Sequence, residues 1–196
     1  ETCMDFEKFI SLIREKNKEI NIISAKTDKK SIIRQRHIID TAQAIDFIDL
    51  NDNICSDLGT GAGLPGIVLA IMMKNLNQSM KFILYEKSHL KSAFLKSVSN
   101  KLNLNTEVIE GNIFEKNNLR SDIVIGRAFK PLPVVLELMS KNFSKFKNLI
   151  LFMGKNGKQT LNDAFKVWNF EYKEKMSLTS KDSFLINIKN IKKKFE

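Results

Sequence analysis

The sequence DLGTGAGLPG, from Asp57 to Gly66, decides the fold that we expect for this chain. It follows the apolar run 54–58, a strand candidate, and leads into the apolar segment 67–73, which suits a buried helix. Its four glycines allow the backbone to approach a ligand closely and to adopt positive φ values. Pro65 suits the first position of the helix, whose free N–H groups then face a ligand above the sheet. The stretch therefore predicts a loop that binds a nucleotide cofactor.

The glycine spacing fits two classes of cofactor site. The pattern Gly61-x-Gly63-x-x-Gly66 matches the dinucleotide fingerprint, whereas Asp57-x-Gly59-x-Gly61-x-Gly63 resembles the first motif of S-adenosylmethionine-dependent methyltransferases. Both folds place an acidic residue at the end of the second strand, where it holds ribose hydroxyls. Glu86 closes the strand candidate 81–85 and has this position. Glu86 therefore predicts an adenosine ribose under either interpretation.

Asp57 favours the methyl donor over a dinucleotide. A sulfonium cation with an α-amino group is attracted by a nearby carboxylate, whereas a pyrophosphate is repelled by it. A glycine-rich turn without any ligand is the remaining interpretation, and the matching position of Glu86 disfavours it. We therefore expect S-adenosylmethionine as the cofactor, and a nicotinamide-dependent oxidoreductase is the first alternative.

Strand and helix candidates alternate along most of the chain, which implies a doubly wound, mostly parallel sheet. After the loop and its helix, the expected elements are a strand at 81–86, a helix at 90–102, strands at 106–110 and 123–125, a helix from about Pro131, a strand at 149–152, a helix at 159–167 and strands at 170–176 and 184–188. The last two strands are joined by too few residues for a crossover helix and should pair antiparallel. A seven-stranded α/β sheet that ends in such a hairpin resembles the class I methyltransferase fold.

The N-terminal segment has a different pattern. Apolar residues at helical spacing predict an amphipathic helix over about 4–18, and Ser31 is a plausible N-cap for a second helix. We therefore expect a helical extension at 1–48 and the methyltransferase domain at 49–196.

Composition narrows the class of protein. With 196 residues and 43% hydrophobic content, the chain can bury one substantial core. No apolar run approaches the roughly 20 residues that span a bilayer, so we expect no membrane contact. Cys3, Cys55 and two histidines show no metal-ligand spacing, which predicts no metal and favours a reducing compartment, the cytoplasm. No long apolar heptad is evident, so we expect a monomer.

The net charge of +10 favours a polyanionic partner, because lysine and arginine bind phosphates and release counterions. The basic residues cluster near both ends of the chain, as in the tail at 189–194. Lysine-rich and asparagine-rich chains also arise from genome composition bias. Charge therefore favours RNA as a partner without naming which RNA.

Several blocks of sequence resemble one specific family, the bacterial small-subunit (16S) ribosomal RNA guanine-N7 methyltransferases, also called the glucose-inhibited division protein B family. The Leu-Pro-Gly ending of the glycine loop carries more weight in this resemblance than the glycines alone. Four further blocks, two before the glycine loop and two after it, occur in the same order as in the family. They are NIIS at 21–24, RHIIDT at 36–41, EKS at 86–88 and DIVIGRAF at 122–129. The resemblance extends from about residue 21 to residue 188.

Two positions depart from the family pattern. Thr41 stands where the family usually has serine, and it keeps the hydroxyl. Met153 stands in place of the lysine of a Lys-Gly pair, so the expected cation after the fifth strand is absent, and Lys155 is the nearest replacement. This departure supports the second alternative, a non-catalytic RNA-binding factor for ribosome assembly.

The resemblance implies methyl transfer from S-adenosylmethionine to N7 of a guanosine in 16S ribosomal RNA, which we expect to be recognised within the 30S subunit. N7 carries a free lone pair and no proton, so the reaction requires no general base. By resemblance, the cofactor residues are Gly59, Gly61, Gly63, Leu64, Glu86, Asn112, Ile113 and Phe114, together with Asp57 and Arg127.

Arg127 is the expected catalytic residue, because it follows a buried strand at the edge of the sheet where ligands bind. It could contact guanine O6, a phosphate or the carboxylate of the methyl donor. The substrate candidates are Arg36, His37, Asp40 and Lys155. His37 and Asp40 are three residues apart on one predicted helix and could pair, either in the pocket or only to stabilise the helix.

Overall fold

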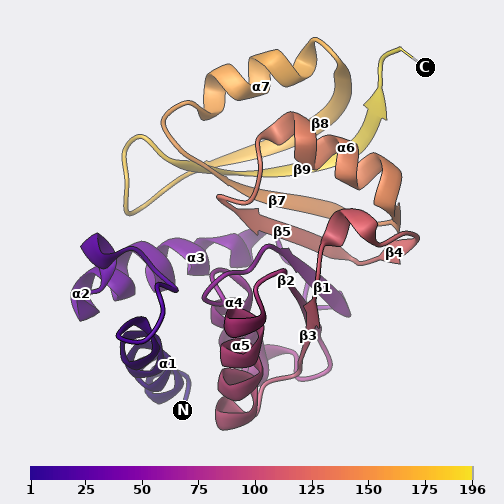
Figure 1. Cartoon of the computed structure of the whole chain (residues 1–196). Coiled ribbons are helices and arrows are strands. Elements are labelled where there is room, and N and C mark those ends of the chain that lie inside the picture. The colour runs from indigo at the N-terminus through magenta and orange to yellow at the C-terminus, as the bar shows by residue number, and fades with distance from the viewer. Residues whose placement is uncertain (196) are drawn as a thin grey trace.

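A mostly parallel sheet of seven strands lies at the centre of the molecule (Figure 1). The computed structural model describes residues 1–195. The seven strands are β1 (Ile54–Leu58), β2 (Lys81–Glu86), β3 (Thr106–Glu110), β5 (Ile123–Arg127), β7 (Asn148–Met153), β8 (Trp168–Met176) and β9 (Phe184–Lys193). Their order in the sheet is β3-β2-β1-β5-β7-β9-β8, and β9 runs antiparallel to both of its neighbours. The predicted seven-stranded α/β sheet with a terminal antiparallel hairpin is confirmed.

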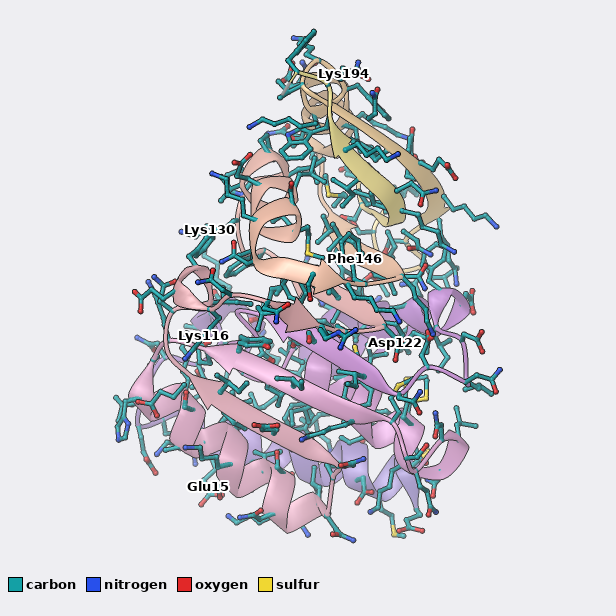
Figure 2. All side chains as sticks on the ribbon, turned by 90° about the vertical axis from the view of Figure 1, so that its right-hand side faces the viewer. Glu15, Lys116, Asp122, Lys130, Phe146 and Lys194 are labelled. Carbon is teal, nitrogen blue, oxygen red and sulfur yellow. The ribbon has the colours of Figure 1, made fainter. Side chains whose placement is uncertain are left out.

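Helices cover both faces of the sheet and side chains fill the space between the layers (Figures 1 and 2). The helices that pack on it are α4 (Gly66–Leu76), α5 (His89–Leu102), α6 (Leu132–Asn142) and α7 (Gly157–Phe165), whereas α1 (Thr2–Asn17) packs on α4 and α5. One hydrophobic cluster includes buried residues of α1, α4 and α5, and a second includes those of α6 and α7. Strands β1 and β5 are almost wholly buried, as expected of central strands covered on both faces, and β1 buries the polar side chains of Ser56 and Asp57 as well.

The N-terminal extension packs on the sheet's helices. Phe9, Ile10 and Ile13 of α1 are fully buried, in the same hydrophobic cluster as Ile67 and Leu95. The extension therefore shares its core with the sheet, and the division at residue 48 stays a prediction.

The second helix of the extension differs from the expectation. It begins at Lys30 after Lys29, so Ser31 does not cap it. It is then irregular, with short segments α2 (Lys30–Ile33), a π-helix at Arg34–Ile39, α3 (Asp40–Ala42) and a 3₁₀ helix at Gln43–Phe47. π-helical turns disturb the regular ladder of backbone hydrogen bonds, and the spacing of apolar residues carries no signal for one.

Two further details were not predicted. Pro65 precedes α4 as its N-cap residue rather than standing inside its first turn, and the Leu64–Pro65 peptide bond is cis. The short strands β4 (Leu119–Arg120) and β6 (Phe143–Lys145) form a separate two-stranded parallel pair. Among residues 1–195, no helix has the length and apolar character that a bilayer crossing requires.

Candidate functional site

The two central strands set the position of the site. Leu58 at the end of β1 pairs with Gly126 near the end of β5, so the loops after these strands leave the sheet side by side. The strand order reverses here, because β2 and β3 lie on one side of β1 and β5 lies on the other. Doubly wound sheets bind ligands in the crevice at such a switch point. The loops at 59–65 and 128–131 are therefore the candidate ligand-binding loops.

The loop after β1 is fixed to the end of β2 through its backbone. Gly59, Gly61 and Gly63 have φ values of +64°, +59° and +89°, a region that favours glycine. The N–H of Thr60 donates to the carbonyl of Tyr85 at 3.1 Å. The loop thus has a backbone conformation that residues with a Cβ rarely adopt, and its backbone groups lie beside the end of β2.

Glu86 lies where the fold places the ribose anchor. Its side chain is held by two backbone donors, the N–H of Gly61 at 2.9 Å and the N–H of Ser88 at 2.9 Å. A carboxylate offers about four acceptor sites, so two remain for other donors. The vicinal hydroxyls of a ribose would satisfy them.

A cleft of about 500 Å³ lies beside this loop. Six of the predicted cofactor residues line it: Gly59, Gly61, Glu86, Asn112, Ile113 and Phe114. A Cβ added to Gly111 at the end of β3 would meet no atom within 4 Å, so the backbone there borders open space. The cleft has the volume of a small-molecule site and an acidic group at one side. These features fit an adenosyl group with its ribose on Glu86.

Aromatic rings form another wall of the cleft. Phe114 is 38% exposed and stacks on Phe129, with ring centroids 6.0 Å apart and an interplanar angle of 15°. Ile113, which lines the same cleft, is buried. Apolar rings of this kind suit a flat purine base.

Asn112 uses its amide within its own turn. Its Oδ1 accepts the N–H of Phe114 at 3.2 Å, and its Nδ2 donates to Glu115 Oε1 at 2.9 Å. The side chain therefore caps the 3₁₀ turn Ile113–Glu115 at the border of the cleft.

Asp57 lies beneath the loop, which corrects the expected contact with the cofactor. The carboxyl group is fully buried, and its Oδ2 accepts the N–H of Gly66 at 2.8 Å. Burial raises the pKa of Asp57 to about 7, against the opposing effects of Thr60 and Gly66. Asp57 therefore supports the start of α4. The sequence led us to expect a direct contact between its carboxylate and a sulfonium, and the buried carboxylate does not make one.

Gly63 and Leu64 also support the loop. A Cβ on Gly63 would lie 2.4 Å from Cγ1 of Ile67, so glycine permits the close packing of the loop on α4. Leu64 packs against the hydrophobic cluster that contains Ile67.

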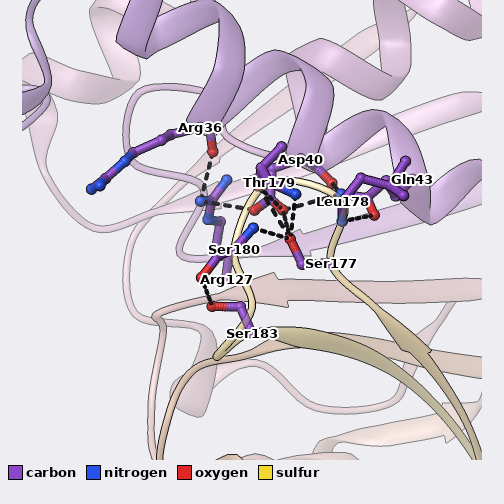
Figure 3. A network of polar contacts seen from close by, with 9 residues as sticks. All are labelled: Arg36, Asp40, Gln43, Arg127, Ser177, Leu178, Thr179, Ser180 and Ser183. Carbon is purple, nitrogen blue, oxygen red and sulfur yellow. Dashed lines mark hydrogen bonds and ion pairs between the residues drawn. The ribbon is translucent and has the colours of Figure 1, made fainter.

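Arg127 ends β5 and lies in a neighbouring cleft of about 290 Å³. Its Nη2 donates to the carbonyl of Arg36 at 2.8 Å and pairs with Oδ2 of Asp40 at 3.1 Å (Figure 3). The guanidinium carbon lies 5.5 Å from the centroid of Phe152, within range of a cation–π contact. Burial lowers the pKa of Arg127, and Asp40 opposes this shift. Its Nη1 is buried without a hydrogen-bond partner among residues 1–195.

The expected pairing of His37 with Asp40 is wrong. Both ring nitrogens of His37 are buried and lack a hydrogen-bond partner within the described chain, while Asp40 contacts Arg127 and three other side chains. Burial, with a further contribution from Arg127, lowers the pKa of His37 to about 4. His37 is therefore neutral near pH 7. Arg36 reaches the site through its backbone carbonyl.

A third cleft of about 370 Å³ lies on the other side of the loop after β5. Lys155 and Met153 both line it, so the exposed ammonium of Lys155 lies close to the position where the family pattern expects a cation. Phe129 and Lys130 line this cleft and the first one alike, which makes the loop after β5 their shared wall.

Sequence reasoning missed four residues of the site: Phe129, Gln43, Ser177 and Thr179. Phe129 is the last residue of the DIVIGRAF block that resembles the family. An aromatic residue two positions after Arg127 was a signal in the sequence for a contact with a ligand. The other three come together only in the folded chain, because more than 130 positions separate Gln43 from the Ser177–Thr179 loop. Among residues 1–195, no group of three or more His, Cys, Asp or Glu side chains could hold a metal ion.

Two solved structures share the fold of this chain. A SAM-dependent methyltransferase from Aquifex aeolicus has a TM-score of 0.61 and 16% sequence identity, and the match covers 89% of this chain and 97% of that one. TrmK of M. capricolum, in complex with S-adenosyl-homocysteine, has a TM-score of 0.56 and 17% identity, with 76% of this chain and 66% of that one covered. At these identities the likeness concerns the fold alone.

Sequence similarity is far closer to one family. A protein of Pelagibacter ubique (strain HTCC1062) named Ribosomal RNA small subunit methyltransferase G is 55% identical over 194 residues, which cover 99% of this chain and 91% of the relative. Residues 2–187 match the family described as GidB, rRNA small subunit methyltransferase G. This match confirms the resemblance of the sequence blocks, and the chain belongs to the rRNA small subunit methyltransferase G family.

Proposed function

We propose that this protein transfers a methyl group from S-adenosylmethionine to N7 of a guanosine in 16S ribosomal RNA. The observation that carries the proposal is the cleft bordered by the glycine loop and Glu86, with Arg127 at the end of the neighbouring strand β5. Membership of the family supports the same activity, since the relative from Pelagibacter ubique is named a ribosomal RNA small subunit methyltransferase. TrmK of M. capricolum, which shares the fold, binds S-adenosyl-homocysteine, the demethylated form of this cofactor.

S-adenosylmethionine, when bound, supplies an activated methyl group on a sulfonium. Glu86 would accept hydrogen bonds from the ribose hydroxyls, and the Phe114–Phe129 pair would contact the adenine. The loops after β1 and β5 would then hold the reacting groups at the switch point of the sheet. Orientation of this kind and exclusion of water lower the barrier without any proton transfer.

The pair of Arg127 and Asp40 suits a reaction in which positive charge moves from sulfur to the purine ring. Nη1 of Arg127, which is buried without a hydrogen-bond partner among residues 1–195, would donate to guanine O6, which lies next to N7. Asp40 balances the charge of the guanidinium, so this donor adds little net repulsion against the cationic product. His37 is neutral near pH 7, and the attack of N7 requires no base.

Lysines at the rims of the clefts support an RNA substrate. Lys87, Lys91 and Lys130 line the first cleft, and Lys155 lines the third. Lys130 extends from the loop after β5 at an edge of the molecule where Lys116 also lies (Figure 2). Such side chains bind phosphates irrespective of sequence. We propose that the assembled 30S subunit is the substrate, that the protein acts as a monomer and that it works in the cytoplasm.

The test is transfer of labelled methyl groups from S-adenosylmethionine to 30S subunits from a strain that lacks this protein. We expect the label in 16S RNA, and digestion to nucleosides should release it as 7-methylguanosine. Naked 16S RNA and wild-type 30S subunits serve as comparison substrates. Label in another nucleoside would contradict the assignment of N7, and binding of subunits without transfer would favour a non-catalytic assembly factor. Binding of NAD instead of S-adenosyl-homocysteine would favour an oxidoreductase.

A further inference from the structure

The loop between β8 and β9 reaches the N-terminal extension and contacts Asp40 with two hydroxyl groups (Figure 3). The hydroxyls of Ser177 and Thr179 each donate to Oδ1 of Asp40 at 2.8 Å. Asp40 lies 137 positions before Ser177, so only the folded chain creates this contact. The terminal hairpin of the sheet and the extension are thereby joined at the residue that pairs with Arg127.

Gln43 makes a second connection between the same two segments. Its Nε2 donates to Oδ1 of Asp40 at 3.1 Å and to the carbonyl of Asp40 at 3.1 Å. Its Oε1 accepts the N–H of Leu178 at 2.8 Å. Gln43 is only 4% exposed, and both ends of its amide are hydrogen-bonded, so its position is well defined.

These contacts fix the direction of the Asp40 carboxylate. Oδ1 accepts three side-chain donors, from Gln43, Ser177 and Thr179, whereas Oδ2 accepts Nη2 of Arg127 at 3.1 Å. Rotation of the carboxylate would break all three bonds to Oδ1. Nη2 of Arg127 also donates to the carbonyl of Arg36, and Nη1 is buried without a partner among the described residues.

We propose that Gln43, Ser177 and Thr179 are positioning residues, which fix Asp40 so that Arg127 presents Nη1 to the target guanosine. This inference rests on the proposed methyl transfer. The side chain of Arg127 has several rotatable bonds, and a fixed guanidinium removes the need to order it in the transition state. Catalysis would then depend on the docking of residues 177–179 onto the extension, although this loop lies outside the cleft that fits the adenosyl group.

The test uses the two half-buried hydroxyl groups of this network, with the variants Ser177→Ala and Thr179→Val, alone and combined. Ser180→Ala is the matched control, because the Ser180 hydroxyl contacts Ser183 and not Asp40. At saturating cofactor, we expect the combined variant to lower kcat on 30S subunits by roughly 100-fold, the size typical of a misplaced catalytic group. Affinity for S-adenosyl-homocysteine should change less than about 2-fold, since residues 177–179 are remote from Glu86 and its cleft.

A double-mutant cycle separates positioning from general stability. In an Arg127→Lys background, the loop substitutions should have almost no further effect on kcat, because their target is already lost. Equal losses in both backgrounds would overturn the inference, and so would wild-type kcat for the combined variant. If the combined variant does not fold, the single variants are scored by the same cycle. Absence of methyl transfer by the wild-type protein would instead refute the proposed function itself.

Discussion

Gly61 donates its backbone N–H to Oε2 of Glu86 at 2.9 Å, so the glycine loop and the acidic end of β2 form one connected edge of the cleft. This single contact links the two sequence features that predicted an adenosine site, although 25 positions separate them. It also places Glu86 beside the loop before any ligand binds. The cleft therefore requires little rearrangement to accept a ribose.

Glu86→Gln should weaken the binding of S-adenosyl-homocysteine by roughly 10- to 100-fold, because a hydrogen bond to a charged acceptor contributes about 1.5–3 kcal/mol. The amide keeps the size of the side chain but loses the charge. Isothermal titration calorimetry measures the change. Glu110→Gln, at the end of the adjacent strand β3, is the control and should bind like the wild type. Equal affinities of the wild type and both variants for S-adenosyl-homocysteine would show that Glu86 does not contribute to binding.

Asp57 should make the stability of the protein depend on pH. Its folded pKa of about 7 exceeds the ordinary value of 3.8, so the folded state binds more protons than the unfolded state between these values. The free energy of unfolding should therefore fall as pH rises from about 4 to 7, by up to roughly 4 kcal/mol. Asp57→Asn should remove most of this slope, because the amide stays neutral and its oxygen can still accept the N–H of Gly66.

Urea unfolding of the ligand-free wild type and of Asp57→Asn at pH 5, 6, 7 and 8 measures this slope. The variant should match or exceed the wild type in stability at pH 8 and lose its advantage at pH 5. Parallel curves for the two proteins would show that Asp57 does not cause the dependence.

Arg127→Ala should lower methyl transfer severely and leave the protein folded. The variant removes Nη1 as a donor, while Asp40 keeps its three other side-chain donors, from Gln43, Ser177 and Thr179. Loss of one positioned donor to the reacting base lowers turnover by roughly 100- to 1000-fold. Single-turnover transfer to 30S subunits measures the loss, and circular dichroism checks the fold. Near-normal turnover by this variant would contradict the assigned role.

Lys155→Ala should weaken binding to 30S subunits and reduce the slope of log affinity against log salt by about one. Lys155 is exposed at the rim of the third cleft, close to the position of the missing family lysine. Lys96→Ala, on the exposed side of α5, is the control and should leave the slope unchanged. An identical slope for the Lys155 variant would mean that this ammonium contacts no phosphate. Met153→Lys should restore or raise affinity in the Lys155→Ala background.

Much of the fold could be predicted from local pattern. The alternation of apolar strands with helices and the short connection before β9 were sufficient for the sheet and its antiparallel end. The irregular helix from Lys30 to Phe47 was not predictable, because the spacing of apolar residues carries no signal for its π-helical turn. The pair β4–β6 was also missed, since strands of two and three residues carry too little periodicity.

The site was predictable where a motif fixes the backbone, as in the glycine loop and Glu86, both of which line the cleft. The role of Asp57 was not, because sequence cannot distinguish a carboxylate that faces a ligand from one that is buried under a loop. The pairing of Asp40 with Arg127 and with the 177–179 loop was equally hidden, because it joins three distant parts of the chain. The helical spacing of His37 and Asp40 suggested a local pair, and the tertiary partners of Asp40 replaced it.

The most direct test of the account is a map of N7-methylated guanines in 16S RNA from cells with and without this protein. We predict that one 7-methylguanosine disappears from 16S RNA when the protein is removed, returns with the wild-type protein and does not return with Arg127→Ala. An unchanged set of 7-methylguanosines after removal of the protein would contradict the account.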